Sequence, residues 1–411
     1  MKNWIAPRVD SSINFLKKLY KLSESTYLKI DKRNVILSSE QKYKEFMSCS
    51  YLGIHNDERI IKEIQTSNEL KDSGFLFSSA RTRMVSIMEK KVESKLNMVF
   101  DPYLTVLFQN VHSVHLGVIP LLLSGKFPGV ESEKGFHCII DKFAHQSLKV
   151  MIGIMEQFSS VSIIDLDKWD SIEKETEKAT SLNKKIFILT DSLGSMGKVY
   201  DINRIVKYVE KHDGFVYFDD AHSTSILGKN GSGYVIDTLK NKINKKVFIS
   251  TGLTKGFGSH GGIMLVHNQQ QVDFIKTYAT TYTFSGPLPN TNLIATNICC
   301  DIHLSDEINH LQKSLKDNLL FFDTNFKYPN LNLCKDTILP FRTILIGLES
   351  DLHKCISFLR KNSVLVTGAS YPTVEKGKSI IRISLSSLNT HDDINTLLKV
   401  IHLFIKREKI C

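Results

Sequence analysis

Short apolar runs that end in polar residues recur through the middle of the chain. They lie at residues 103–110, 136–145, 161–167, 184–192, 214–220, 245–251 and 262–268. Segments with helical spacing separate several of them; one opens on Asp201, a candidate N-cap, and stops at Gly214. This alternation of strands and amphipathic helices predicts an α/β fold with a mostly parallel sheet.

The two ends of the chain follow other patterns. Residues 1–45 are polar and lysine-rich, and the spacing of Ile13, Leu16 and Tyr20 predicts an N-terminal helix and arm. After Pro287 and Pro289 we expect a long helix over about 291–327, strands at 338–348 and 380–387, and a closing helix with a capping box at Thr390 and Asp393. We therefore predict an arm at 1–45, a large domain at 46–290 and a small α+β domain at 291–411.

Composition and charge narrow the class of protein. With 42% hydrophobic and 23% charged residues among 411, the chain is typical of a globular protein. It has no apolar run near the roughly 18–20 residues of a membrane span and no apolar secretory segment, which predicts a cytoplasmic location. Its seven cysteines form no CxxC, which indicates reduced thiols and no metal site.

The net charge of +10 admits an anionic partner. Because the lysines are scattered, we expect no nucleic acid, whereas a phosphate-bearing substrate would suit this charge. Residues 74–86 are rich in small and hydroxyl side chains and carry Arg81 and Arg83. Either a loop beside an anion or a solvated turn fits this segment.

Residues 214–263 hold the groups that point most directly to chemistry. Asp219 ends one strand, His222 follows it, and Lys255 lies in a small-residue turn after another strand. A carbonyl cofactor held as an imine needs an anion for its ring nitrogen, a donor for its phenolic oxygen and an amine for its aldehyde. Ligands of parallel sheets collect at the carboxyl ends of strands, where Ser192, Asp219 and the turn after Ile249 would lie. Taken singly, a lysine in such a turn is more often solvated, and Asp219 could equally be a helix N-cap or turn aspartate.

Six motifs in order support the chemical interpretation. They are DKFAHQS, DSLGSMGK, FDDAHSTSILGKNGSG, TGLTKGFGSHGG, FSGPLP and IRISLSS. With these motifs the chain resembles the α-oxoamine synthases over roughly residues 45–400. This family has the aspartate-aminotransferase fold (fold type I) of enzymes that use pyridoxal 5'-phosphate (PLP). The resemblance implies a large PLP-binding domain and a smaller C-terminal domain.

The resemblance also implies a role for each residue of the site. Lys255 would bind PLP covalently, Asp219 would pair with its ring nitrogen, His145 would stack on its face, and His222, with Ser195 near it, would bond its phenolic oxygen. Arg382 would grip the carboxylate of the amino-acid substrate. The phosphate would be held by Val111, His112 and Thr254, and Ser285 would reach the phosphate of a neighbouring subunit in a homodimer.

Several positions depart from the family pattern. Val111-His112 replaces a glycine-aromatic pair, and Gly252, between Thr251 and Thr254, stands where a hydroxyl is usual. Four further departures are His115 for a helix asparagine, Lys198 in the SMDG segment, Ile87 for the glycine near Arg83, and Asn389 for a histidine.

The function implied is a PLP-dependent acyltransferase. It would condense a small amino acid with an acyl-CoA or an acyl carrier protein thioester and decarboxylate the product to an α-aminoketone. An aminotransferase or a non-acylating decarboxylase is an alternative, as is an α-hydroxyketone autoinducer synthase-like enzyme, which FAHQSL and IIRISLSS also resemble. A catalytically silent partner subunit is disfavoured because Lys255, Asp219 and His222 are all present.

Overall fold

We analysed a computed structural model of the chain. It describes residues 25–410 except Phe77, Lys335, Thr337 and Pro372, together with Val9, Ile13, Lys17 and Leu19. The helix predicted from Ile13, Leu16 and Tyr20 thus lies largely outside the described residues. The chain forms two compact units: a central unit of residues 54–195 and 199–309, and a terminal unit of residues 1–53, 196–198 and 310–411.

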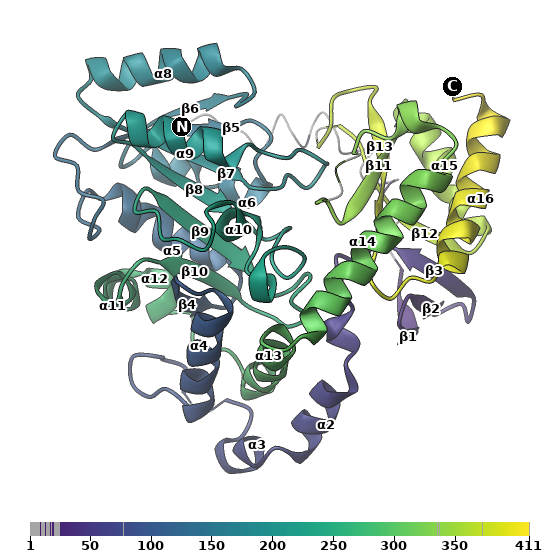
Figure 1. The fold of residues 1–411 in the computed structure, drawn as a ribbon, viewed down its shortest axis with the longest axis horizontal. Coiled ribbons are helices and arrows are strands. Elements are labelled where there is room, and N and C mark those ends of the chain that lie inside the picture. The colour runs from purple at the N-terminus through teal and green to yellow at the C-terminus, as the bar shows by residue number, and fades with distance from the viewer. Residues whose placement is uncertain are drawn as a thin grey trace. The chain divides into compact units, whose positions relative to one another are not determined.

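The central unit contains a seven-stranded sheet (Figure 1). Its order is β4 (Leu104–Phe108), β10 (Gly262–Val266), β9 (Val247–Gly252), β8 (Phe215–Asp219), β7 (Lys185–Asp191), β5 (Phe136–Asp141) and β6 (Ser160–Ile164). In this sheet as described, β10 runs opposite to the other six strands, so its pairings with β4 and β9 are antiparallel and the remaining pairings are parallel. The prediction of a mostly parallel α/β sheet is therefore confirmed.

Helices pack on this sheet and connect its strands. They are η1 (Ile54–Asn56), α2 (Glu58–Thr66), α3 (Asn68–Ser73), α4 (Ile87–Val99), α5 (Val111–Leu123), α6 (Gln146–Lys149), α7 (Ile152–Met155), α8 (Trp169–Ser181), α9 (Ile202–Lys211), η2 (Lys229–Gly231), α10 (Tyr234–Thr238), α11 (Gln269–Tyr278), α12 (Thr280–Thr283) and α13 (Asn290–His303). Phe187, Phe215 and Phe248 on adjacent strands share one buried cluster with Val118 and Leu122 of α5. This apolar layer fixes α5 against the sheet.

The terminal unit has a six-stranded sheet of its own. Its order is β1 (Tyr27–Asp31), β2 (Asn34–Leu37), β3 (Lys42–Phe46), β12 (Val364–Ala369), β13 (Ser379–Ser384) and β11 (Phe341–Gly347). Its helices are α14 (Glu307–Asn325), which begins in the central unit, η3 (Pro329–Leu331), α15 (Glu349–Lys361) and α16 (His391–Glu408). Thr390 and Asp393 form the predicted capping box of α16.

Two expectations about the ends of the chain were wrong. Residues 27–46, predicted as part of a helix and arm, form three strands because Val35, Leu37 and Tyr43 alternate into a small core. Since β3 pairs in parallel with β12, this segment groups with the C-terminal residues and not with a separate arm. The two compact units divide at 53/54 and 309/310, with residues 196–198 also in the terminal unit. The domain boundaries predicted at 45/46 and 290/291 stay a prediction.

The long helix expected over 291–327 is two helices, α13 and α14. The Leu304 N–H closes α13 on Cys300, and the Ser305 hydroxyl accepts the Glu307 N–H at 3.3 Å where α14 starts. A serine that bonds nearby backbone in this way favours a helix end over a helix interior. In the part of the chain that the structure describes, the helices all lack the length and apolarity needed to cross a membrane.

Candidate active site

A cavity of about 270 Å³ opens in the central unit at the carboxyl ends of β7, β8 and β9. The predicted residues that line it are Val111, His112, His145, Asp219, His222, Thr254 and Lys255. It is also lined by Asn110, Ser147, Asp191, Leu193, Ala221, Gly252 and Gly261. The fold thus brings together side chains that are up to 145 positions apart in the sequence, from Asn110 to Lys255.

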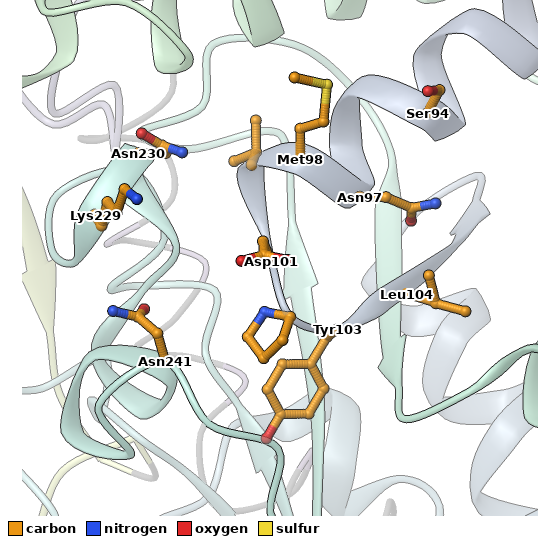
Figure 2. A pocket seen from close by; sticks show the side chains of 11 residues that line it. Ser94, Asn97, Met98, Asp101, Tyr103, Leu104, Lys229, Asn230 and Asn241 are labelled. Atoms are coloured by element: carbon orange, nitrogen blue, oxygen red, sulfur yellow. The ribbon is translucent and has the colours of Figure 1, made fainter.

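A larger cavity of about 520 Å³ lies elsewhere in the same unit (Figure 2). Figure 2 shows Asn97, Asp101, Tyr103, Asn230 and Asn241 around it, at the end of α4, before β4, in η2 and in the loop after α10. It contains none of the predicted site residues and no histidine. The predicted site residues that line a cavity are therefore all at the smaller one.

The N-terminus of α5 forms one wall of the smaller cavity. Asn110 caps the helix by accepting the Ser113 N–H at 2.8 Å. The first N–H groups of a helix have no partner in its own backbone and carry partial positive charge, so this end favours an anion. Gly262 allows β10 to approach this turn, because a Cβ there would lie 2.2 Å from the Asn110 carbonyl carbon.

The hydroxyl expected at position 252 is replaced by an apolar contact. A Cβ on Gly252 would lie 2.8 Å from Cγ2 of Val111, so the valine methyl occupies the space that a larger residue would need. Of the two flanking threonines, Thr251 bonds the hydroxyl of Thr224, whereas Thr254 lines the cavity. The departures at 111 and 252 are therefore two sides of one contact.

Backbone hydrogen bonds shape the turn that carries Lys255. The Leu253 N–H donates to Gly261, the Ser259 N–H to Leu253 and the Gly258 N–H to Lys255. These bonds close the turn tightly beside the end of β9. Lys255 is thereby held on the wall of the cavity.

Two carboxyl groups lie side by side at the strand ends. Asp219 on β8 is in register with Asp191 on β7, and Oδ1 of Asp219 accepts the Ala221 N–H at 3.1 Å. Burial and the neighbouring Asp219 charge raise the pKa of Asp191 well above its usual value. Asp191 also accepts the backbone N–H of His145 at 3.0 Å, so it fixes the backbone of the histidine that lines the cavity. Asp191 was not among the predicted site residues, although its place at the end of a strand, like that of Asp219, was the available signal.

Asp220 turns away from the cavity. Its backbone carbonyl accepts the N–H groups of Ser223 and Thr224, as expected of a turn aspartate. Its buried carboxyl group accepts a short hydrogen bond from the Ser192 hydroxyl, and burial raises its pKa to about 7. Ser192 is at the end of its strand as predicted, but its hydroxyl serves Asp220.

Three predicted residues lie outside the walls of this cavity as described. Ser195 is half-buried, and Ser285 is exposed in the segment whose carbonyls accept the Gln109 amide. Arg382 belongs to β13 of the terminal unit. There its Nη2 donates to the Tyr51 hydroxyl at 3.0 Å, and its guanidinium covers the Phe341 ring at 4.2 Å. The roles of these three residues stay predictions.

In the segment 74–86, Arg81 is neither solvated nor left available for an anion. It is buried, paired with Glu89, and donates to the Leu107 carbonyl at 2.6 Å. Its guanidinium also lies 3.9 Å from the centre of the Tyr282 ring. Its charge is therefore neutralised within the fold, while Arg83 is exposed.

Comparison with known proteins assigns this arrangement to a family. A family model described as aminotransferase class I and II matches residues 138–401. The chain belongs to this family. It is 26% identical over 394 residues to 8-amino-7-oxononanoate synthase 1 of Bacillus subtilis (strain 168), with 95% of each chain covered. It is 28% identical over 360 residues to 8-amino-7-oxononanoate synthase of Petrotoga mobilis, with 86% of each covered.

Solved structures show the same fold. Serine palmitoyltransferase of Sphingomonas wittichii superposes with a TM-score of 0.83 at 15% identity over 99% of both chains. 8-Amino-7-oxononanoate synthase from Francisella tularensis gives 0.70 at 21% identity over 89% of this chain and 98% of that one. The predicted α-oxoamine synthase resemblance, the fold type and PLP as the cofactor are confirmed.

The residues that line the smaller cavity of this aminotransferase-family chain fit PLP. The volume is slightly below the roughly 300–1,000 Å³ of sites for larger ligands, which suits a single-ring cofactor. An amine (Lys255), a carboxylate (Asp219) and the N-terminus of α5 face one space, as the aldehyde, ring nitrogen and phosphate require. Within the described residues we find no group of three or more His, Cys, Asp or Glu side chains arranged for a metal ion.

Proposed function

We propose that this chain is a PLP-dependent acyltransferase that joins a small amino acid to the acyl group of a thioester. The observation that carries the proposal is the shared cavity of Lys255, Asp219, His145 and His222, in a chain similar to proteins named 8-amino-7-oxononanoate synthase. In the proposed reaction the α-carbon of the amino acid bonds to the acyl carbon, and the thioester C–S bond breaks. Thiol and CO₂ leave, and an α-aminoketone remains.

Bound PLP supplies an electron sink for negative charge at the α-carbon. Lys255 would hold the aldehyde and, as a free amine, would move the α-proton as a general base. Asp219 would hold the proton on the ring nitrogen, His145 would cover the ring, and His222 would donate to the phenolic oxygen. The α5 N-terminus with Thr254 would bind the phosphate. Arg382 grips the carboxylate of the amino acid, for which a planar fork of donors is suited.

The test uses purified full-length protein with PLP, a panel of amino acids and a panel of acyl-CoA and acyl carrier protein thioesters. We expect a visible absorption band with PLP, and thiol release only when both substrates are present. Lys255→Ala should lose the band and the activity, whereas Lys211→Ala, on the exposed face of α9, should keep both. A wild-type protein that fails to bind PLP would contradict the proposal.

The products separate the alternatives. A new amino acid and pyridoxamine phosphate without thiol release would indicate an aminotransferase. A ketone other than the α-aminoketone, identified by mass spectrometry, would indicate chemistry of the autoinducer synthase kind. Gly252, which stands where the family has a hydroxyl residue, motivates the aminotransferase alternative, because the Val111 methyl beside it changes the space around the expected phosphate.

We further infer a cytoplasmic homodimer in which Ser285 reaches the phosphate site of the other subunit. Ser285 is exposed and follows Phe284, whose side chain is 82% exposed. We place this exposed ring, together with Ser285, at the subunit interface that the family resemblance implies. Sedimentation of the full-length protein tests the assembly.

A further inference from the structure

Behind the cavity, one imidazole reaches the carboxylate that the proposed function assigns to the cofactor ring. His115 lies in the first turns of α5 and is completely buried. Its Nε2 is 3.5 Å from Oδ2 of Asp219 and 3.2 Å from the Ser250 hydroxyl oxygen. His115 does not line the cavity itself, so it could act only through a neighbour.

The surroundings determine which form of the ring is present. Burial lowers the pKa of His115 to about 4, even though Asp219 opposes this shift. The ring is therefore neutral near pH 7 and carries a single N–H. Nε2 lies near two oxygens, Oδ2 of Asp219 and the Ser250 hydroxyl, and a lone pair on it would face the Asp219 carboxylate, so the proton belongs on Nε2. The Ser250 hydroxyl can itself donate to the Phe218 carbonyl, 3.5 Å away, so the one Nε2–H is shared between Asp219 and the Ser250 oxygen.

Asp219 is then held on both of its oxygens. Oδ1 accepts the Ala221 N–H at 3.1 Å, and Oδ2 faces Nε2 of His115. The His115 ring is fixed in turn by a T-shaped contact with the Tyr217 ring, with centroids 5.7 Å apart and an angle of 74° between the ring planes. A carboxylate clamped in this way keeps one orientation toward the cavity without reorganisation when a ligand binds.

We propose that His115 is a positioning residue for Asp219, and that its Nε2–H fixes the carboxylate for the ring nitrogen of PLP. This inference rests on the proposed function, because it assumes that Asp219 serves the cofactor. His115 replaces the helix asparagine of the α-oxoamine synthases. The longer histidine side chain places its Nε2 near Asp219, so a donor on α5 can reach the end of β8.

The test compares two isosteric substitutions. Gln at position 115 keeps an N–H donor near the place of Nε2, whereas Met has the same length and no donor. We expect His115→Met to weaken PLP binding about tenfold, in the range of one hydrogen bond to a charged group, and His115→Gln to stay within about threefold of wild type. The dissociation constant of PLP is measured by titrating the cofactor-free full-length protein.

A double-mutant cycle shows whether the effect passes through Asp219. In an Asp219→Asn background, His115→Met should cause no further loss of PLP affinity. His137→Met is the matched control, because His137 is also a buried histidine, bonded to Glu175 and Ser160 away from the cavity. It should lower the melting temperature and leave PLP affinity unchanged.

Two results would overturn the inference. One is a His115→Met protein that binds PLP as tightly as the His115→Gln protein; the other is a loss of the same size in the Asp219→Asn background. Should the Met variant not fold, His115→Leu takes its place in the same cycle. A wild-type protein without PLP binding would instead contradict the proposed function, so the two failures are distinguishable.

Discussion

At the scale of single residues, Gly252 and Val111 depend on each other. The methyl of Val111 fills the volume beside Gly252, so neither departure from the family pattern could occur easily without the other. Overpacking such a contact costs about 1–3 kcal/mol. The two departures, at the start of α5 and the end of β9, are therefore expected to act together.

Restoring the hydroxyl at position 252 tests this dependence. We expect Gly252→Ser alone to lower the free energy of unfolding by about 1–3 kcal/mol and to weaken PLP binding, because the new side chain meets Cγ2 of Val111. Val111→Ala combined with Gly252→Ser should recover both. Urea denaturation and PLP titration measure the outcome, and equal losses in the single and double variants would refute the coupling.

Asp220 gives a prediction about pH. Its pKa is about 7 in the folded chain, because burial disfavours the charge, and about 4 when the chain is unfolded. Between these values the folded state binds one more proton than the unfolded state, so the stability that this group contributes is full below pH 4 and is lost as pH rises toward 7. Asp220→Asn should remove this dependence.

The measurement is the free energy of unfolding in urea across pH 4 to 8. The Asp220→Asn protein should gain on wild type as pH rises, by on the order of 2–4 kcal/mol over the range. Asp213→Asn is the control with a pKa shift of opposite sign. Hydrogen bonds from Lys246 and Lys185 lower the pKa of Asp213, so the stability that its carboxylate contributes is lost only as pH falls through that lowered pKa. Parallel curves for wild type and Asp220→Asn would be evidence against the pKa shift.

At the scale of elements, the site is made by places where elements end. The strands β8 and β9 stop at Asp219 and Gly252, and α5 starts at Val111, all on one cavity. The first N–H groups of α5 lack partners within the helix and can bind a ligand, whereas β8 and the turn after β9 contribute the side chains of Asp219 and Lys255. The regular parts of these elements are buried and serve to hold the ends in place.

The cap of α5 separates helix stability from anion binding. Asn110→Asp keeps an oxygen for the Ser113 N–H and suits the helix dipole, so the melting temperature without PLP should hold or rise slightly. The added negative charge should weaken PLP binding about tenfold or more, since the phosphate is expected beside it. Asn110→Ala, by contrast, should cost about 1 kcal/mol of stability. Equal PLP affinity of Asn110→Asp and wild type would place the phosphate elsewhere.

At the scale of the whole molecule, the N-terminal and C-terminal parts of the chain fold together into the terminal unit. Strands β1 to β3 and the C-terminal strands form one sheet, joined by the parallel pairing of β3 with β12. The terminal unit is therefore complete only with residues from the N-terminal part. A truncated chain that began after residue 53 would lose half of this sheet's strands.

Assembly is the prediction at this scale. Phe284→Glu should shift the full-length protein from dimer to monomer and weaken PLP binding, because the exposed ring would pack on the second subunit beside Ser285. Leu182→Glu changes another exposed apolar side chain, 49% exposed at the end of α8, and should leave the dimer intact. Sedimentation velocity distinguishes the two. A monomeric wild type would contradict the homodimer.

The sequence by itself was enough to predict the strands β4 to β10, the capped start of α16, the family and the cofactor. Strong periodicity and short motifs carry this information locally, so no long-range contact was needed. It failed at β1 to β3 and at the break between α13 and α14. Pairing with β12, 318 positions beyond β3, decided the first, and bonds made by Ser305 decided the second.

Only the tertiary structure showed how the predicted groups are arranged and supported. It placed Asp191 beside Asp219, turned Ser192 toward Asp220, buried Arg81 on Glu89, and set His115 behind the carboxylate. The sequence determined which chemical groups the chain carries, because motif spacing along a strand or turn is a local property. Which of them share one cavity, and which side chain orients another, depends on packing between elements that are distant in the sequence.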